Sequence, residues 1–238
     1  MVSEIFRMDN ISKSFSGNTV LSRVDLNVFE GEVLALVGEN GAGKTTLSKI
    51  ISGIYRNDGG YIYFKEKEIS ISNPTGQQKL GISSVPQELT LISDMSIAEN
   101  IFIVRKSESD KIMLKRPLIN KKTEKLLEMV GLDISPDALV NELSRSQKQL
   151  VQIAKAVSFD AKLIVMDEPA SGLYDREVLK LEAIVKNLKA KGTSVIFISN
   201  KLDEVIDIAD NGEFMPQKST DFYPKMLTGM VVNKLNLG

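Results

Sequence analysis

The chain has 238 residues, 42% hydrophobic and 26% charged, with 30 Lys and Arg against 31 Asp and Glu. This balance is typical of a folded globular protein and excludes a disordered chain and a strongly basic nucleic-acid binder. Because the chain contains no Cys and no His, thiol, imidazole, disulfide and Cys/His metal chemistry are excluded, and any bound metal should be Mg²⁺ held by oxygen ligands.

The first third of the chain has the pattern of antiparallel hairpins around one different unit. Residues 4–30 and 59–72 are short β-rich runs separated by glycine turns. Between them, Val33 to Val37 is a continuous apolar run, typical of a strand buried on both faces, and the stretch from Thr45 to Ile54 is predicted to be helical. The sequence therefore predicts a strand-loop-helix unit.

The loop of that unit fits the pattern G-x-x-x-x-G-K-[ST], from Gly38 to Thr45. In this pattern the glycines let backbone N–H groups close around phosphates, and the helix start adds the positive end of its dipole. Lys44 is placed to reach the β- and γ-phosphates, and the hydroxyl of Thr45 to bind Mg²⁺. An ordinary glycine-rich turn is the alternative, but the flanking strand and helix favour a loop that binds Mg²⁺-ATP.

The middle of the chain is helical, and the part after it alternates helix and strand. From Ile97 to about Leu139 the pattern is helical with mixed charge, which predicts an inserted helical lobe. Alternation of this kind predicts a parallel sheet. The expected elements are a helix at 148–158, a strand at 163–167, a helix at 176–190 and a strand at 194–199. From Asn211 to Gly238 the sequence shows no clean pattern before Met226.

Two adjacent carboxylates, Asp167 and Glu168, end the second buried strand. Ligands bind at the carboxyl ends of strands in open α/β sheets, so these side chains should lie near the glycine loop. We expect Asp167 to hold Mg²⁺ through water and Glu168 to polarise the attacking water, because positioning is most of what phosphoryl transfer requires. Many strands end in Asp or Glu for turn formation alone, so the pair is informative only together with the loop.

These residues resemble the nucleotide-binding domain of ATP-binding-cassette (ABC) transporters, over nearly the whole chain to about Asp210. The resemblance implies that Phe15, after Lys13-Ser14, stacks on adenine, although alone it would be a core residue. It implies that Gln87 in Val85-Pro86-Gln87-Glu88 touches Mg²⁺ and reports the nucleotide state to the helical lobe. It also implies that Leu143-Ser144-Arg145-Ser146-Gln147 closes on the ATP of a partner cassette; otherwise Ser144 would be a plain helix cap.

Three positions depart from the family pattern. Ser146 stands where the family usually has Gly, Tyr174 where Asp or Thr is common, and Asn200 where the family has a switch histidine. Asn200 can donate an amide hydrogen bond to the γ-phosphate, but it cannot hold a proton, so hydrolysis should be slowed. Arg145 could pair with phosphate or obstruct it, and both readings stay open.

Motifs and resemblance together predict four groups of site residues. The catalytic group is Glu168, Asn200 and Gln87. The ATP-binding group is Phe15, Gly38, Glu39, Asn40, Gly41, Ala42, Gly43, Lys44, Thr45 and Thr46. The group facing the ATP of a partner is Ser144, Arg145, Ser146 and Gln147, and the metal ligands are Thr45, Gln87 and Asp167.

The predicted fold is an α/β P-loop NTPase core with a parallel sheet, an N-terminal antiparallel β subdomain and an inserted helical subdomain. We expect one domain over 1–238. Residues 1–89 and 146–210 form the ATP-binding core, 90–145 the helical subdomain and 211–238 a divergent C-terminal segment.

Finer likeness at Asn73-Pro74, at 171–178 and at 198–205 resembles monosaccharide importers. It implies an ATP-hydrolysing subunit that powers carbohydrate import, with a second cassette, membrane permease subunits and, indirectly, a sugar-binding protein as partners. No apolar run approaches the ~20 residues of a membrane span, so we expect a cytoplasmic protein held at the inner face of the cell membrane by its permease. The alternative is an ATP-binding, hydrolysis-deficient half of an asymmetric pair. A cassette acting on ribosomes or DNA is disfavoured, because the lysines of 106–125 alternate with acidic residues.

Overall fold

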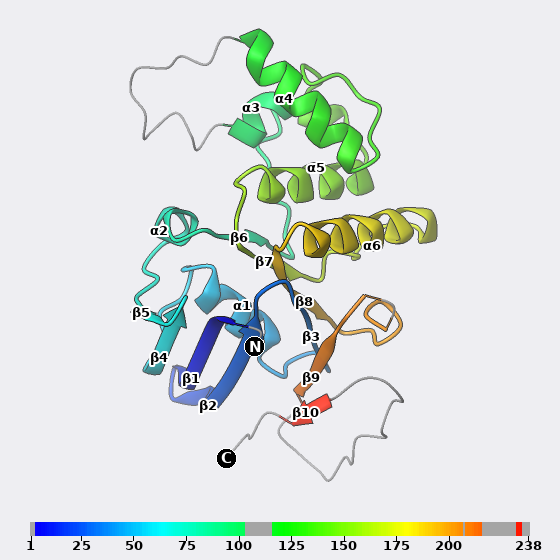
Figure 1. The fold of residues 1–238 in the computed structure, drawn as a ribbon. Coiled ribbons are helices and arrows are strands. Elements are labelled where there is room, and N and C mark those ends of the chain that lie inside the picture. The colour runs from blue at the N-terminus through cyan, green and yellow to red at the C-terminus, as the bar shows by residue number, and fades with distance from the viewer. Residues whose placement is uncertain (1–2, 103–115, 207, 216–231, 235–238) are drawn as a thin grey trace.

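The computed structural model describes residues 3–102, 116–206, 208–215 and 232–234, and its two sheets lie beside a helical lobe (Figure 1). The N-terminal sheet is antiparallel, with strand order β2-β1-β4-β5. Its strands are β1 (Glu4–Phe15), β2 (Asn18–Phe29), β4 (Gly59–Phe64) and β5 (Lys67–Ile69). β1 pairs with β2 on one side and with β4 on the other. The predicted antiparallel hairpins in 4–30 and 59–72 are therefore confirmed.

The second sheet is parallel, and among the described residues it has six strands in the order β10-β9-β3-β8-β7-β6. Its strands are β3 (Val33–Gly38), β6 (Ile82–Val85), β7 (Leu163–Asp167), β8 (Ser194–Ser199), β9 (Asn211–Met215) and β10 (Val232–Lys234). The strands predicted at 33–37, 163–167 and 194–199 are confirmed with their parallel arrangement, whereas β6 and β9 were not predicted.

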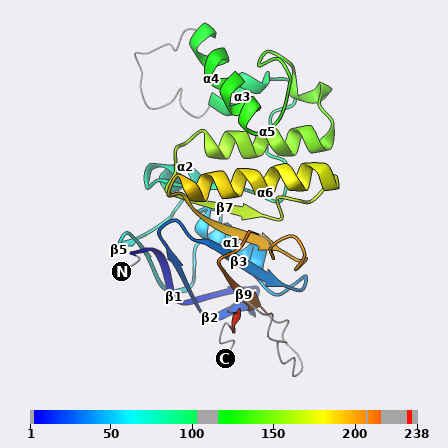
Figure 2. The same cartoon turned by 45° about the vertical axis from the view of Figure 1, so that its right-hand side comes forward.

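Alternate residues of the central strands enter two different hydrophobic cores. On β3, Leu34 and Leu36 pack toward α1 (Lys44–Ile51) and the antiparallel sheet, whereas Ala35 and Val37 face the other core. That other core contains α5 (Arg145–Val157) and α6 (Asp175–Ala190). Figures 1 and 2 both place α5 and α6 on one side of β7 and α1 on the opposite side. Because both faces of the sheet are covered, the central strands β3, β7 and β8 are buried along their whole length and are mostly apolar.

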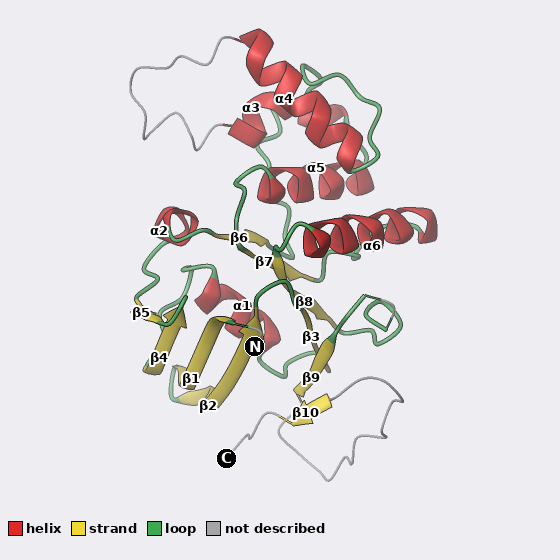
Figure 3. Cartoon of the chain, viewed as in Figure 1, coloured by secondary structure: helices red, strands yellow, loops and turns green. Residues whose placement is uncertain are grey.

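The helical lobe is built on α5 (red in Figure 3). It contains α3 (Ile97–Phe102), α4 (Arg116–Met129) and a short 3-10 helix, η2 (Val140–Glu142), and both α3 and α4 contact α5. The helical character predicted from 97 to 139 is confirmed for these helices, while residues 103–115 lie outside the described chain. Within the described residues, no helix combines the length and apolarity that a membrane crossing needs.

Several predicted boundaries differ from the observed ones. α1 begins at Lys44 and ends at Ile51, so the predicted helix over 45–54 was too long at its C-terminal end. α5 begins at Arg145, three residues before the predicted start, because Ser144 and Gln147 form a capping box at that point. α2 (Pro74–Lys79) was not predicted and begins after Asn73, whose side chain caps Gly76 N at 2.8 Å.

The sequence shows no clean pattern between Asn211 and Met226, yet β9 forms at its start. This strand pairs in parallel with β3, with Leu34 opposite Asn211 and Gly38 opposite Met215. Its Asn-Gly start has the composition of a turn, so its strand conformation is set by the exposed edge of β3 rather than by local propensity. Of the pattern predicted from Met226 to Leu235, only 232–234 belong to the described residues, and they form β10.

Candidate nucleotide site

The carboxyl ends of four parallel strands meet at one edge of the sheet. The pairing places Val85 beside Met166, Asp167 beside Ile198, and Val37 beside Ser199. The residues that follow these strand ends therefore lie side by side. The edge gathers the glycine loop after β3, Gln87 after β6, Glu168 after β7 and Asn200 after β8. The sequence pattern predicted this meeting for the loop and Glu168, and the family resemblance implied it for Gln87 and Asn200.

The glycine loop needs backbone conformations that only glycine adopts without strain. Gly41 and Gly43 have φ of 85° and 94°, in the left-handed region, and Gly43 is the N-cap of α1. The side chain of Lys44 is folded back into this loop and is only 5% exposed. Its Nζ donates hydrogen bonds to Gly38 O at 2.6 Å and to Glu39 O at 2.8 Å. The loop thus holds its one positively charged group, the ammonium of Lys44, at its own centre.

Two features of the surroundings of Lys44 shift its pKa in opposite directions. Burial lowers the pKa of the Lys44 ammonium, while the nearby carboxylates of Glu168, Asp167 and Glu39 oppose that shift. A partly desolvated cation at the start of a helix is a strong point of attraction for phosphate, because no water shell screens it.

Asp167 is the most buried carboxylate of the site, with 2% of its surface exposed. Burial raises the pKa of Asp167, and a hydrogen bond from Ser48 on α1 opposes the rise. Among the described residues, its Oδ1 atom is one of two buried side-chain oxygens or nitrogens that have no hydrogen-bond partner. Such an atom costs ~1–3 kcal/mol when left unpaired. A hard cation, or water bound to one, would satisfy this oxygen, so Asp167 fits the predicted Mg²⁺ role.

Glu168 is held in position by its backbone and by Gln87. The Nε2 atom of Gln87 donates to Oε2 of Glu168 at 2.8 Å, which brings together the ends of β6 and β7. The backbone N–H of Glu168 donates to Ile198 O at 2.9 Å. Its φ of 46° lies in the left-handed region, which costs a non-glycine residue about 1–2 kcal/mol. Backbone strain of this kind is concentrated at functional sites.

Asn200 is exposed and reaches toward the glycine loop. Its Nδ2 atom lies 3.4 Å from Oδ1 of Asn40, at the long limit of a hydrogen bond. The turn behind it is firmer, because Ser199 Oγ donates to Glu204 Oε2 at 2.6 Å and Lys201 N donates to Ser199 Oγ at 3.0 Å. The side-chain amide of Asn200 is therefore presented at the edge of the site by an ordered turn.

Phe15, at the end of β1, is 37% exposed and is not a core residue. Its ring meets the ring of Tyr55 edge to face, with centroids 5.1 Å apart and planes at 64°. Lys13 and Asp58 form an ion pair at 2.6 Å beside it. The Nζ atom of Lys13 lies over the ring, 5.4 Å from its centroid, and the part of the ring that stays exposed is available for the predicted adenine contact.

The segment Ser144 to Gln147 lies at the N-terminus of α5, across β7 from α1 in both views (Figures 1 and 2). Ser144 Oγ accepts from Gln147 N at 3.2 Å, and Gln147 Oε1 accepts from Ser144 N at 2.8 Å. Ser146 is buried, with its hydroxyl 3.1 Å from that of Ser144. Arg145 packs over Gly172, since a Cβ built there would lie 3.0 Å from its Nε. The segment therefore begins the helix on the side of the sheet opposite to the side that α1 covers.

Four further side chains support the site and were not predicted from the sequence. They are Ser48, Tyr55, Gln149 and Gln152. Gln149 and Gln152 are 3% and 2% exposed, although both are polar. A glutamine on the buried face of an amphipathic helix is a detectable signal, because a buried amide needs hydrogen-bond partners. The contacts of Ser48 and Tyr55 leave no such signal in the sequence.

The family model described as ABC transporter matches residues 21–171, which include the glycine loop, Gln87 and Asp167-Glu168. The chain belongs to the ABC transporter family. Its observed two-sheet α/β architecture agrees with the fold predicted from that resemblance. Among solved structures, a nucleotide-free ATP-binding cassette from an ABC transporter superposes with a TM-score of 0.78 at 31% identity, covering 89% of this chain and 87% of that one.

Curated relatives of this ABC family member are named for sugar import. A ribose import ATP-binding protein, RbsA of Caldanaerobacter subterraneus, is 41% identical over 87% of this chain and 42% of its own length. A relative in Agrobacterium fabrum, named for import of ribose, galactose or methyl galactoside, is 38% identical over 98% of this chain and 46% of its own length. The chain spans less than half the length of these relatives.

Proposed function

We propose that this chain binds Mg²⁺-ATP and hydrolyses it to drive carbohydrate import through a membrane permease. The observation that carries the proposal is the meeting of Lys44, Asp167, Glu168 and Gln87 at one sheet edge. Its support from comparison is family membership and the sugar-import names of relatives at about 40% identity.

Binding is assigned to the glycine loop and the start of α1. Lys44 exchanges its two carbonyl partners for the β- and γ-phosphates, while the backbone N–H groups of 38–46 surround the phosphate oxygens. Thr45, Asp167 and Gln87 would hold Mg²⁺, which neutralises phosphate charge when bound. The exposed ring of Phe15 offers its face to the adenine.

Hydrolysis is assigned to Glu168, which accepts a hydrogen bond from the attacking water and orients it. Gln87 and the backbone bond to Ile198 fix this carboxylate, so little reorganisation is needed. Asn200 donates its amide hydrogen to the γ-phosphate but carries no proton in transit. Slow turnover of the isolated chain follows from that difference.

The remaining partners follow from the position of Ser144 to Gln147. Because this segment lies across the sheet from the glycine loop of its own chain, we assign it to the ATP bound by a second cassette. A permease would hold the pair at the inner face of the cell membrane, and a sugar-binding protein would deliver the cargo. The alternative, a passive half that binds ATP without hydrolysing it, is favoured by Asn200 where the family has a histidine and by Ser146 where it usually has Gly.

Replacing Lys44 by Ala tests the proposed site. We expect ATP affinity to fall ~10- to 100-fold, because a charge-assisted hydrogen bond contributes about 1.5–3 kcal/mol. Isothermal titration calorimetry with Mg²⁺-ATP measures the loss. Lys155→Ala is the matched control, since burial also lowers the pKa of Lys155 but that side chain lies on α5. Equal affinities in the wild type and the Lys44→Ala variant would refute the assignment.

A further inference from the structure

The loop that carries Gln87 occupies every hydrogen-bonding position of the Gln152 side-chain amide, on α5. Its Nε2 donates to Pro86 O at 2.9 Å and to Glu88 O at 3.3 Å. Its Oε1 accepts from the backbone N–H of Thr90 at 2.8 Å and from the hydroxyl of Thr90 at 3.3 Å. Two donors and two acceptor positions are all that a glutamine amide has. The side chain is 2% exposed, so these bonds form away from water.

These four bonds flank Gln87 on both sides. Pro86 precedes Gln87 and Glu88 follows it, so the backbone on each side of Gln87 is attached to the same buried amide. Gln87 itself is exposed, and its side chain points to the carboxylate of Glu168 at 2.8 Å. The position of Gln87 is therefore fixed by Gln152, a buried residue that is not at the sheet edge where nucleotide is proposed to bind.

The helix α5 also holds the backbone next to Glu168, the residue that Gln87 contacts. Gln149, three residues before Gln152 on α5, donates to Pro169 O at 3.1 Å, next to Glu168. Residues three apart lie on one face of a helix. One face of α5 thus fixes the backbones beside both Gln87 and Glu168, while its N-terminus carries Ser144.

We propose that Gln152 is a positioning residue for the hydrolysis assigned above: it fixes the loop of Gln87 so that this side chain meets Glu168. The proposal rests on the proposed ATPase function for its kinetic consequence. A displacement of about 1 Å can cost ~10²-fold in rate, so small movements of the loop should be visible in turnover.

Gln152→Leu keeps the approximate size of the side chain and removes all four bonds. We expect kcat to fall about 10- to 100-fold, with the KM for ATP changing less than about 2-fold, because Lys44 and the glycine loop are untouched. In nucleotide-free protein, hydrogen-deuterium exchange of a peptide covering 86–92 should become faster, since the Thr90 amide loses its acceptor.

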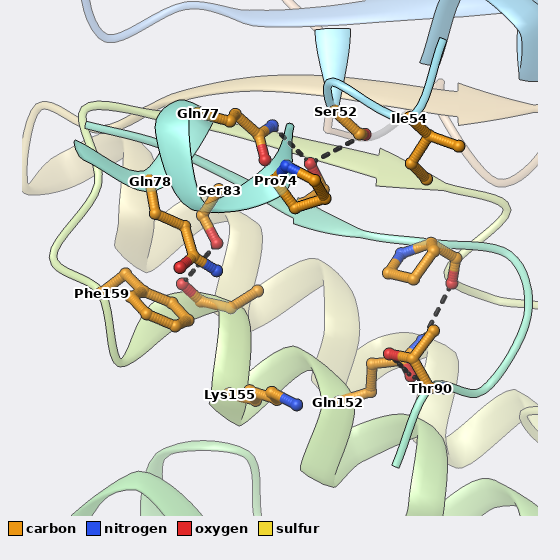
Figure 4. A pocket seen from close by; sticks show the side chains of 13 residues that line it. Ser52, Ile54, Pro74, Gln77, Gln78, Ser83, Thr90, Gln152, Lys155 and Phe159 are labelled. Carbon is orange, nitrogen blue, oxygen red and sulfur yellow. Dashed lines mark hydrogen bonds between the residues drawn. The ribbon is translucent and has the colours of Figure 1, made fainter. Parts of the chain in front are cut away.

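Gln77→Leu is the matched control. Gln77 is also a glutamine with 2% exposure and lines the same cavity of about 260 Å³, but its Nε2 bonds to Ser84 Oγ at 2.6 Å instead of the loop (Figure 4). This variant should lose comparable thermal stability while keeping both kcat and the exchange rate of 86–92.

Gln152→Glu is the conservative variant and serves if the leucine variant does not fold. It keeps an acceptor for Thr90, and Lys155, three residues further on α5 and lining the same cavity, stabilises the added negative charge. Its exchange rate and kcat should fall between those of the wild type and Gln152→Leu.

Three results would overturn the proposal, and two of them involve kcat: equal loss of kcat in Gln77→Leu and Gln152→Leu, or faster exchange of 86–92 with kcat unchanged. The exchange measurement needs no nucleotide. If the wild type hydrolyses no ATP, the proposed function fails. Unchanged exchange in Gln152→Leu would separately show that Gln152 does not hold the loop.

Discussion

Asn200 is the residue whose departure from the family pattern should affect the rate of the proposed hydrolysis most. It stands at the end of β8, on an ordered turn, and presents a neutral amide where the family resemblance expects a histidine. Its nearest polar partner is Asn40 of the glycine loop, at 3.4 Å. A longer side chain at this position would reach further into the site from the same backbone.

Asn200→His is expected to raise kcat at least about tenfold, because a positioned acid-base or electrostatic group commonly contributes ~10²- to 10⁴-fold. The KM for ATP should change little, since the ground-state contacts come from Lys44 and the loop. Phosphate release at saturating Mg²⁺-ATP and high protein concentration measures the change. In a Glu168→Gln background the same substitution should give no increase. If turnover stays at background while ATP-dependent dimers form, the passive-half alternative is the better account.

At the same scale, the sequence predicted which residues meet but not what holds them. Lys44, Asp167 and Glu168 could be predicted because their motifs end strands of a parallel sheet, and such ends share one edge. Ser48 and Tyr55 could not, because their contacts with Asp167 and Phe15 depend on tertiary packing. The functional roles of all these residues remain predictions until variants are measured.

Among the elements, α5 combines two roles that a substitution at Ser144 can separate. Ser144 caps the helix with its hydroxyl and is also the residue we assign to the ATP of a partner cassette. Alanine removes both functions. Aspartate keeps the cap, since its carboxylate also accepts from the backbone N–H groups, but its charge repels phosphate.

Ser144→Ala should lower stability by ~1 kcal/mol, or about 2–4 °C in melting temperature for a chain of this size. Ser144→Asp should melt within about 1 °C of the wild type yet lose most ATP-dependent dimerisation and turnover. Thermal unfolding and size-exclusion chromatography with Mg²⁺-ATP check the pair. Wild-type turnover in the aspartate variant would mean that Ser144 is only a helix cap.

The elements that could be predicted are those whose own residues show a clear hydrophobic pattern. β3 and β7 are unbroken apolar runs, and the sequence located them within one residue. β6 is only four residues long and contains Ser83 and Ser84, so its strand conformation depends on pairing with β7. The helix α5 begins before its predicted start because side chains cap its N-terminus, and hydrophobic periodicity does not reveal such caps.

For the whole molecule, Asp167 links the site to folding stability. Its folded-state pKa is raised, mainly by burial and despite the nearby charge of Lys44, so folding favours the neutral carboxyl. Asp167 therefore contributes its full stabilisation to the folded state at pH values below about 3.9, the pKa of Asp in the unfolded chain. This contribution is lost as the pH rises through the higher pKa that Asp167 has in the folded protein. At neutral pH the folded protein therefore carries an unfavourable buried charge.

Asp167→Asn should stabilise the nucleotide-free protein at pH 7 by roughly 1 kcal/mol, about 2–4 °C in melting temperature. The gain should shrink as pH falls toward 4, because the aspartate then becomes neutral. Adding Mg²⁺-ATP should reverse the order, since only the wild type gains the full binding energy. Differential scanning calorimetry across pH 4–8 gives both curves. A destabilised variant at pH 7 without nucleotide would contradict the linkage.

The contact of Phe15 with Tyr55 has an optical consequence for the whole protein. The chain has five tyrosines and no tryptophan, so tyrosine emission is not lost to indole by energy transfer. A base that stacks on Phe15 alters the surroundings of the Tyr55 ring, which lies 5.1 Å from it. The unlabelled protein thus contains its own fluorescent reporter for occupancy of the adenine position.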